Sequence, residues 1–241
     1  MRQIWILTKK ELRSFFDSLM AYVMIVIFLG FSGFFTWLYG SDVFMINQAS
    51  LQSFFSIAYW TLFFFIPALT MRLIAEEKRA GTLELLLTKP ISDWQLVVGK
   101  FLATFLLIGI TLALTLVYYF SVWRLGPIDH GAVWTGYLGL LLMSAAYISI
   151  GIYASSVTNN QIVSFLFALF IGIFFHIIFG ILSNNFTGLI GQVLNYLDLS
   201  THYESISRGV IDSKDLVYFL SVVFIGLFLS EINLAKRNVS F

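Results

Sequence analysis

The stretch FLATFLLIGITLALTLVYYFSVW at residues 101–123 contains no Asp, Glu, Lys or Arg. A helix needs about 20 mostly apolar residues to cross the ~30 Å hydrocarbon core of a bilayer, because each residue advances it by about 1.5 Å. The stretch is therefore long enough for one membrane span. Its apolar residues are continuous rather than alternating, which excludes the strands of a membrane β-barrel.

Further charge-free runs occupy residues 18–41, 43–71 and 130–197. The last is long enough for two spans, separated by a polar segment at residues 155–161, and a final apolar run at 216–234 is interrupted only by Glu231. The sequence therefore predicts an all-α, polytopic membrane protein with six transmembrane helices. We place these helices at about residues 19–40, 52–71, 101–122, 134–154, 162–182 and 215–234.

The composition excludes most soluble classes. Hydrophobic residues make up 59% of the 241 residues and charged residues 11%, against roughly 45–50% and about 25% in soluble domains. The net charge of +1 gives no field that would attract a polyanion, so we expect no nucleic-acid partner. The absence of cysteine excludes disulfide scaffolds and thiolate metal sites.

The distribution of Lys and Arg predicts the orientation, because basic residues concentrate in cytoplasmic loops. With six spans, most of the 14 basic residues fall on the side that holds both termini, namely Arg2, Lys9, Lys10, Arg13, Arg72, Lys78, Arg79, Lys89, Lys100, Lys236 and Arg237. The opposite side holds Arg124, Arg208 and Lys214. We therefore expect both termini to be cytoplasmic.

The N-terminal segment, residues 1–18, is predicted to form an amphipathic interfacial helix ahead of a six-span domain at residues 19–241. Its apolar face comprises Ile4, Trp5, Leu12, Phe15 and Phe16. Ile6 and Leu7 depart from this pattern. Basic residues opposite aromatic ones suit a helix that lies among lipid headgroups. The alternative is a charged flank that only sets the topology.

The cytoplasmic loop at residues 72–100 is predicted to contain a short helix at residues 83–89. Gly81 interrupts the extension of the second span, Thr82 is suited to cap a new helix, and Glu84 lies in its first turn. Pro90 ends it, and Ser92 with Gln95 forms a capping box for the third span. We expect the charges of the first part of the loop to be solvated: Glu76, Glu77, Lys78 and Arg79.

The leucines of this short helix, Leu83, Leu85, Leu86 and Leu87, need an apolar partner. Either the bilayer surface or a second protein would provide one. The flanking charges favour a docked protein.

The loop at residues 183–214 is predicted to form an external helical hairpin before the last span. Apolar residues from Phe186 to Leu197 follow helical spacing, Thr201 and Glu204 form a capping box, and a second helix ends at Arg208 and Gly209. These helices would line an exit path or seal the end of the bundle, and the sequence favours neither.

Motifs for nucleotide binding and hydrolysis are absent from the sequence. Gly99-Lys100 is followed by Phe101, so there is no Walker A motif, and there is no GxSxG or HExxH. We expect no metal or cofactor in this chain and no enzymatic activity of its own. His176 is the only titratable residue deep in a span, and the pattern favours a neutral, hydrogen-bonded imidazole over a proton or metal site.

The stretch EEKRAGTLELLLTKPISDWQLVVGK at residues 76–100 resembles the coupling loop of the type-2 ABC exporter permeases. The matching positions are Glu77, Lys78, Gly81, Thr82, Leu83, Glu84, Leu86, Leu87, Pro90, Ile91, Ser92, Gly99 and Lys100. The residues we expect to take part in ATPase coupling are Glu76, Glu77, Arg79, Gly81, Thr82, Leu83, Glu84, Leu86, Leu87 and Pro90. The resemblance implies that this segment is a coupling helix docking on separate ABC ATPase subunits, which bind the ATP and Mg. It also implies that residues 1–18 are the family's connecting helix, and that the chain forms a permease core in a bacterial inner membrane as a homodimer or with a second permease-like subunit that carries an external domain.

Three stretches resemble a gliding-motility-associated subgroup of these permeases: ELLLTKPIS at 84–92, NQIV at 160–163 and HYESISRGVID at 202–212. The last stretch supplies an external helix motif, composed of Glu204, Ser207, Arg208, Gly209 and Asp212. Two other classes remain open. One is a membrane scaffold that recruits an ATPase without transport, and the other is a membrane-embedded enzyme, for which His202, Glu204 and Asp212 are the candidate residues.

Overall fold

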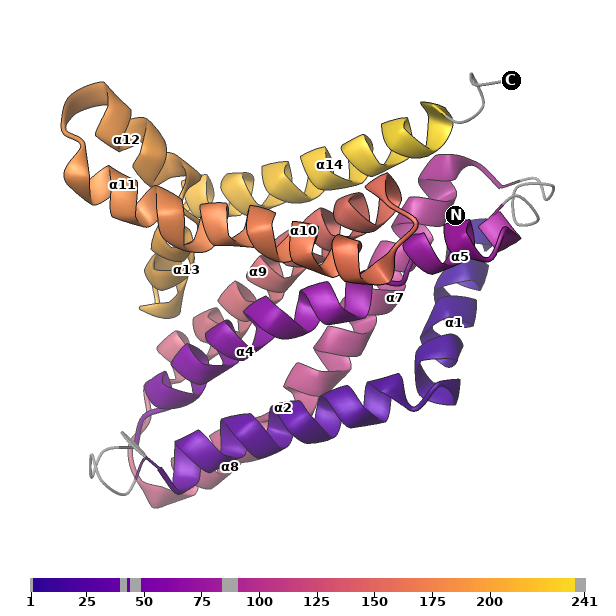
Figure 1. Ribbon diagram of the computed structural model, residues 1–241. Helices are drawn as coiled ribbons and strands as arrows, with labels where there is room; N and C mark the ends of the chain where they lie inside the picture. Colours follow the sequence, from indigo (N-terminus) through magenta and orange to yellow (C-terminus); the bar gives the residue numbers. More distant parts are fainter. Residues whose placement is uncertain (1, 40–42, 44–48, 84–90, 237–241) are drawn as a thin grey trace.

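The computed structural model describes residues 2–39, 43, 49–83 and 91–236, and the elements assigned in these residues are helices (Figure 1). They are α1 (Arg2–Asp17), α2 (Met20–Trp37), α4 (Gln52–Thr70), α5 (Ala75–Arg79), α7 (Asp93–Leu114), α8 (Leu116–Leu125), α9 (His130–Val157), α10 (Gln161–Ile173), the π-helix η1 (Phe174–Ile178), α11 (Phe179–Asn185), α12 (Gly188–Leu197), α13 (Leu199–Ser207) and α14 (Ser213–Ala235).

Six helices or helix pairs in these residues are long and apolar enough to cross a membrane, which confirms the predicted fold class. They are Met20–Trp37, Gln52–Arg79, Asp93–Leu125, His130–Val157, Gln161–Asn185 and Ser213–Ala235. Several extend past the predicted apolar runs, because a helix continues into the headgroup layer, where charged residues are solvated.

The span α9 is the most buried of the six and packs against α4, α7, α10, α13 and α14. Small residues allow this close packing, as is common between membrane helices. A Cβ atom on Gly226 of α14 would lie 2.9 Å from the backbone carbon of Ser149, and one on Gly151 would lie 2.0 Å from the Thr70 hydroxyl oxygen. The helix α14 therefore approaches the backbone of α9 at Gly226, and the Thr70 side chain of α4 lies directly against Gly151 of α9.

Two of the predicted spans are not continuous α-helices. The third is divided at Thr115 into α7 and α8, and the Thr115 hydroxyl lies 3.0 Å from the Tyr137 hydroxyl of α9. The fifth contains η1, centred on His176. Such π-helical turns insert one residue into the helix and are frequent at functional sites.

The first helix meets α2 at a sharp corner (Figure 1), where Leu19 adopts a left-handed φ of 58°. The buried residues of α1 are Leu7, Thr8 and Phe15, whereas Trp5 is exposed. The predicted apolar face is therefore partly correct: Phe15 is buried and Ile4, Leu12 and Phe16 are partly buried, whereas Trp5 is not. Leu7, which departs from the predicted pattern, is buried because α1 packs on α7 with Leu7 directly over Gly99, where an added Cβ would lie 2.8 Å from the Leu7 Cβ.

The start of α1, the end of α14 and the helix α5 lie at one end of the bundle, which we call the near end (Figure 1). The helices α12 and α13 lie at the other, the far end. The predicted capping box of Thr201 and Glu204 is wrong, because Asp198 caps α13 by accepting a hydrogen bond from the Thr201 amide at 3.0 Å. The sequence pattern missed this cap since α13 begins two residues earlier, at Leu199.

The close packing of α9 and α14 predicts that alanine substitutions at Gly226 and Gly109 change the stability of the folded protein by different amounts. Gly226→Ala should destabilise the folded protein by about 1–3 kcal/mol, because the added methyl forces the helices apart. Gly109→Ala in α7 serves as the control, since its Cβ would meet nothing within 4 Å, and it should be neutral or stabilising by up to about 1 kcal/mol. Thermal unfolding of the two purified variants measures the difference. Equal unfolding midpoints would contradict the packing described here.

Candidate functional site

The chain leaves α4 through a short turn, forms α5, and then turns at Gly81. Gly81 has a φ of +67°, the left-handed conformation that ends helices and that glycine adopts without strain. This confirms the predicted interruption at Gly81. Beyond it, Thr82 is exposed and its hydroxyl donates to the Glu77 carbonyl at 3.4 Å, whereas Leu83 is 4% exposed. The remaining predicted residues of this segment, Glu84, Leu86, Leu87 and Pro90, lie outside the described residues.

Lys100 is the central charged group of the near end. Its side chain is 1% exposed, and its Nζ lies 2.7 Å from Glu77 Oε1 and 3.4 Å from Glu11 Oε1. Removing an ammonium group from water is costly unless carboxylates and hydrogen bonds compensate. Here one carboxylate comes from α5 and the other from α1. The buried lysine therefore ties both elements to α7.

The structure corrects the expected solvation of the loop charges. Glu76 and Arg79 are exposed as predicted, but the Glu77 side chain is only 17% exposed because it faces Lys100. The sequence pattern gave no indication that Lys100 is buried and paired. Its partners lie 23 and 89 residues away, and no local pattern indicates such a pairing.

The end of α9 holds α5 from the other side. The Ser155 hydroxyl oxygen accepts hydrogen bonds from the amides of Ile74 and Ala75, each at 3.0 Å, and donates to the Met71 carbonyl at 3.0 Å. The Ser156 carbonyl accepts from Lys78 Nζ and from Asn233 Nδ2 of α14. The polar segment at residues 155–161, predicted only as a break between spans, is thus a polar junction.

The capping box of Ser92 and Gln95 is confirmed at the start of α7. The Ser92 hydroxyl accepts from the Gln95 amide at 3.2 Å, and the Gln95 side chain accepts from the Ser92 amide at 3.3 Å. The box fixes where α7 begins, and hence the depth at which Lys100 enters the bundle.

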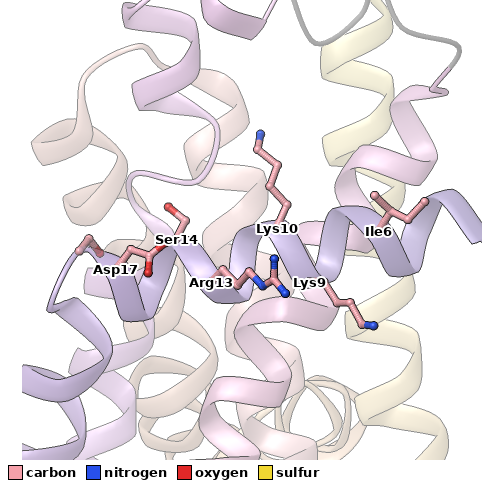
Figure 2. Close-up of a pocket in the computed structure, with 7 residues that line it drawn as sticks. Ile6, Lys9, Lys10, Arg13, Ser14 and Asp17 are labelled. Atoms are coloured by element: carbon pink, nitrogen blue, oxygen red, sulfur yellow. The ribbon is translucent and has the colours of Figure 1, made fainter.

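The opposite face of α1 is basic and open. Lys9, Lys10 and Arg13 extend from this helix around a shallow hollow of about 740 Å³ (Figure 2). The Lys9 ammonium lies 5.4 Å from the centre of the Trp5 ring, which is within the range of a cation–π interaction. This face suits anionic headgroups or an acidic protein surface.

The near-end contacts join α5 to two spans: the Glu77–Lys100 pair joins it to α7, and the Ser155 hydrogen bonds join it to α9. Among the described residues, no group of His, Asp or Glu is placed to hold a metal ion.

The candidate residues of the far end are not brought together. Glu204 pairs with Arg208 at 2.9 Å, and both are exposed. The Ser207 hydroxyl donates to the Glu204 carbonyl at 3.0 Å, and Gly209 ends α13 with a φ of +98°. Asp212 caps α14, and the pKa of its carboxyl is lowered by its hydrogen bond to Lys214. These residues shape a turn between helices.

His202 is paired with a residue that sequence reasoning missed. Its Nδ1 lies 2.6 Å from Asp215 Oδ1, and its Nε2 lies 3.1 Å from the Tyr196 carbonyl oxygen. Asp215 follows Asp212 closely in sequence but lies one turn into α14, where it is buried. The proposed enzyme cluster of His202, Glu204 and Asp212 is therefore not assembled, and His202 instead fastens α13 to α14.

Six long apolar helical segments, of which α9 packs against α4, α7, α10 and α14, define a multi-pass membrane protein. Residues 5–232 match the model of the ABC-2 family transporter protein, and the chain belongs to this family. It is the membrane permease component of an ABC-2 transporter, and permeases of this family pair with ABC ATPase subunits. Comparison with curated proteins gives no match.

The buried charge pair predicts that replacing Lys100 strongly lowers the stability of the folded protein, and that a second substitution at Glu77 restores much of it. Lys100→Met should destabilise the protein by about 3–5 kcal/mol, because it leaves Glu77 buried without a cation. Adding Glu77→Gln should restore much of the loss, since the uncompensated charge is then removed. Lys10→Met, at an exposed lysine, is the matched control and should cost no more than about 1 kcal/mol. Thermal unfolding of the unmodified protein, Lys100→Met, Glu77→Gln, the double variant and Lys10→Met measures these losses. If the loss in the double variant equalled the sum of the losses in the two single variants, the pairing would be contradicted.

Proposed function

We propose that the chain couples ATP hydrolysis by a separate ABC ATPase to export through a dimeric permease, with the segment after α5 as the coupling element. The supporting observation is the attachment of α5, whose Glu77 is paired with the buried Lys100 immediately before the segment at residues 83–89. A docking element needs such a rigid base, because a force applied to a loosely held loop would not reach the spans.

The residues of the coupling element have distinct roles. Glu76, Arg79 and Thr82 are exposed and would contact the ATPase, while Glu77 and Leu83 hold the element to the bundle. Gly81 sets the direction of the chain between these two parts. From the sequence, we assign Glu84, Leu86, Leu87 and Pro90 to the part that enters the ATPase surface.

The proposed mechanism is mechanical. Closure of the ATPase dimer around ATP and Mg moves the coupling elements, and the Glu77–Lys100 pair passes the displacement to α7 while Ser155 passes it to α9. Because α9 packs on α4, α10 and α14, its displacement reaches most of the bundle. The permease cleft then opens alternately or toward the lipid.

The setting that we propose is a bacterial inner membrane with both termini cytoplasmic. The basic hollow of α1 would then face the inner headgroup layer, as expected for a connecting helix. We further propose a gliding-motility type of exporter, supported by the three stretches at 84–92, 160–163 and 202–212. The second permease subunit would be another copy or a related chain with an external domain.

The far-end helices are proposed to lie in the outer headgroup layer. Leu189, Ile190 and Val193 of α12 are 80%, 61% and 57% exposed, which is costly in water and favourable in lipid. The external motif of Glu204, Ser207, Arg208, Gly209 and Asp212 would hold this hairpin at the mouth of an exit path.

A comparison of two glycines tests the coupling role. Gly81 and Gly188 both have positive φ, +67° and +74°, and a Cβ on either would meet nothing within 4 Å. Valine therefore imposes similar backbone strain at both positions without a clash. Gly81→Val should abolish the stimulation of ATPase turnover by the permease in proteoliposomes, whereas Gly188→Val should retain it.

The alternative of a scaffold makes a different prediction for the same assay. A scaffold would bind the ATPase, but the permease would not change its turnover. Stimulation that survives both Gly81→Val and Glu84→Arg would show that the coupling element is elsewhere.

A further inference from the structure

A cleft of about 840 Å³ opens at the far end and reaches inward to His176. Its rim carries the charged residues Asp129, Glu204 and Arg208, and its inner part is aromatic, formed by Tyr59, Trp60 and Tyr203. The volume falls within the range of about 300–1,000 Å³ that is usual for small-molecule sites.

Two residues that line this cleft each carry a buried polar atom with no hydrogen-bond partner among the residues that the structure describes. The atoms are His176 Nε2 and the Tyr59 hydroxyl oxygen, on side chains that belong to residues only 4% and 8% exposed. Leaving such a group unpaired costs about 1–3 kcal/mol each. An arrangement with two of them beside one cleft therefore points to a ligand that completes their hydrogen bonds.

The aromatic contacts hold the His176 ring in a fixed position. Tyr59 and Phe63 stack on it at centroid distances of 4.2 and 4.5 Å, and Trp60 meets it edge-on at 4.7 Å. The Ser200 hydroxyl donates to the His176 carbonyl at 2.6 Å, which ties η1 to α13. The ring is therefore preorganised at the inner part of the cleft.

The hydrogen bond at the other ring nitrogen indicates which proton His176 carries. Its Nδ1 lies 2.5 Å from the Tyr147 hydroxyl, and Tyr147 is buried. If the hydroxyl donates to Nδ1, the imidazole is neutral with its proton on Nε2. The reverse tautomer would leave the Tyr147 proton unpaired as well, which adds a further penalty. The inner part of the cleft thus offers one N–H donor and one hydroxyl.

We propose that this cleft binds a neutral amphiphile, with a carbonyl or hydroxyl group at the edge of the stacked His176 and Tyr59 rings and an apolar body against the aromatic wall. A charged group is disfavoured at this depth, because the inner part offers no counter-charge. The proposal does not rest on ATPase coupling, and it is tested by binding alone.

Photo-crosslinking tests this site directly. A monoacylglycerol with a diazirine in its acyl chain is incorporated with the purified chain into phospholipid nanodiscs, and labelled peptides are mapped by mass spectrometry. We expect label on peptides that contain Tyr59, Trp60 or Tyr203. Unlabelled monoolein should displace it, whereas the hydrocarbon 1-octadecene should not, because it has no acceptor for His176.

Tyr59→Phe is the decisive variant, since it removes only an unpaired hydroxyl and keeps the ring, so folding should be preserved. Loss of one hydrogen bond should lower specific labelling about 3- to 10-fold. Tyr196→Phe, an exposed tyrosine of the same end outside the cleft, is the matched control and should label as the unmodified chain does. Equal labelling of Tyr59→Phe, equal competition by 1-octadecene, or label confined to the outer surfaces of α2 and α14 would overturn the proposal.

Discussion

The near end of the molecule depends on one buried cation. Lys100 is excluded from solvent, and the carboxylates of Glu77 and Glu11 are the groups that compensate its charge. Because these carboxylates belong to α5 and α1, the same desolvation penalty that makes the lysine costly also holds two peripheral elements in fixed positions. An apolar contact would hold them less specifically, since the hydrophobic effect has no direction. Among the described residues, the second oxygen of Glu77 has no hydrogen-bond partner.

The two ends of the bundle are linked through α9. At the near end, Ser155 and Ser156 bind α5 and α14, and farther along the helix Gly151 and Ser149 bring α4 and α14 into close contact. Toward the far end, Tyr147 bonds to His176, and Gly139 packs on Tyr203. A rigid, closely packed helix transmits displacement along its axis, since protein interiors resist compression. The polar junction at the near end and the aromatic cleft therefore share one helix, α9.

The sequence predicted the features that depend on local chemistry. Charge-free runs located the six spans, and Gly81 and the capping box of Ser92 and Gln95 were placed correctly because each is a property of a few consecutive residues. It failed where the determinant was tertiary. The burial of Leu7 in α1 depends on its contact with Gly99 of α7. The helix α13 is capped by Asp198 rather than by Thr201, and His202 forms its hydrogen bond with Asp215 rather than with Glu204 or Asp212. The interruptions at Thr115 and η1 were also missed, since a π-turn or a helix break within an apolar run leaves no change in hydrophobicity.

The proposed docking of the coupling element is tested most directly by cross-linking from Thr82. The chain contains no cysteine, so Thr82→Cys introduces a single attachment point for a photoreactive probe on an exposed residue directly after Gly81. Ile190→Cys provides the comparison at the far end. With the ATPase present, illumination should join position 82 to the ATPase, with a yield that changes between the ATP-bound and nucleotide-free states, and position 190 should give no such product. Cross-links from position 82 to lipid alone in both states would contradict the proposed docking.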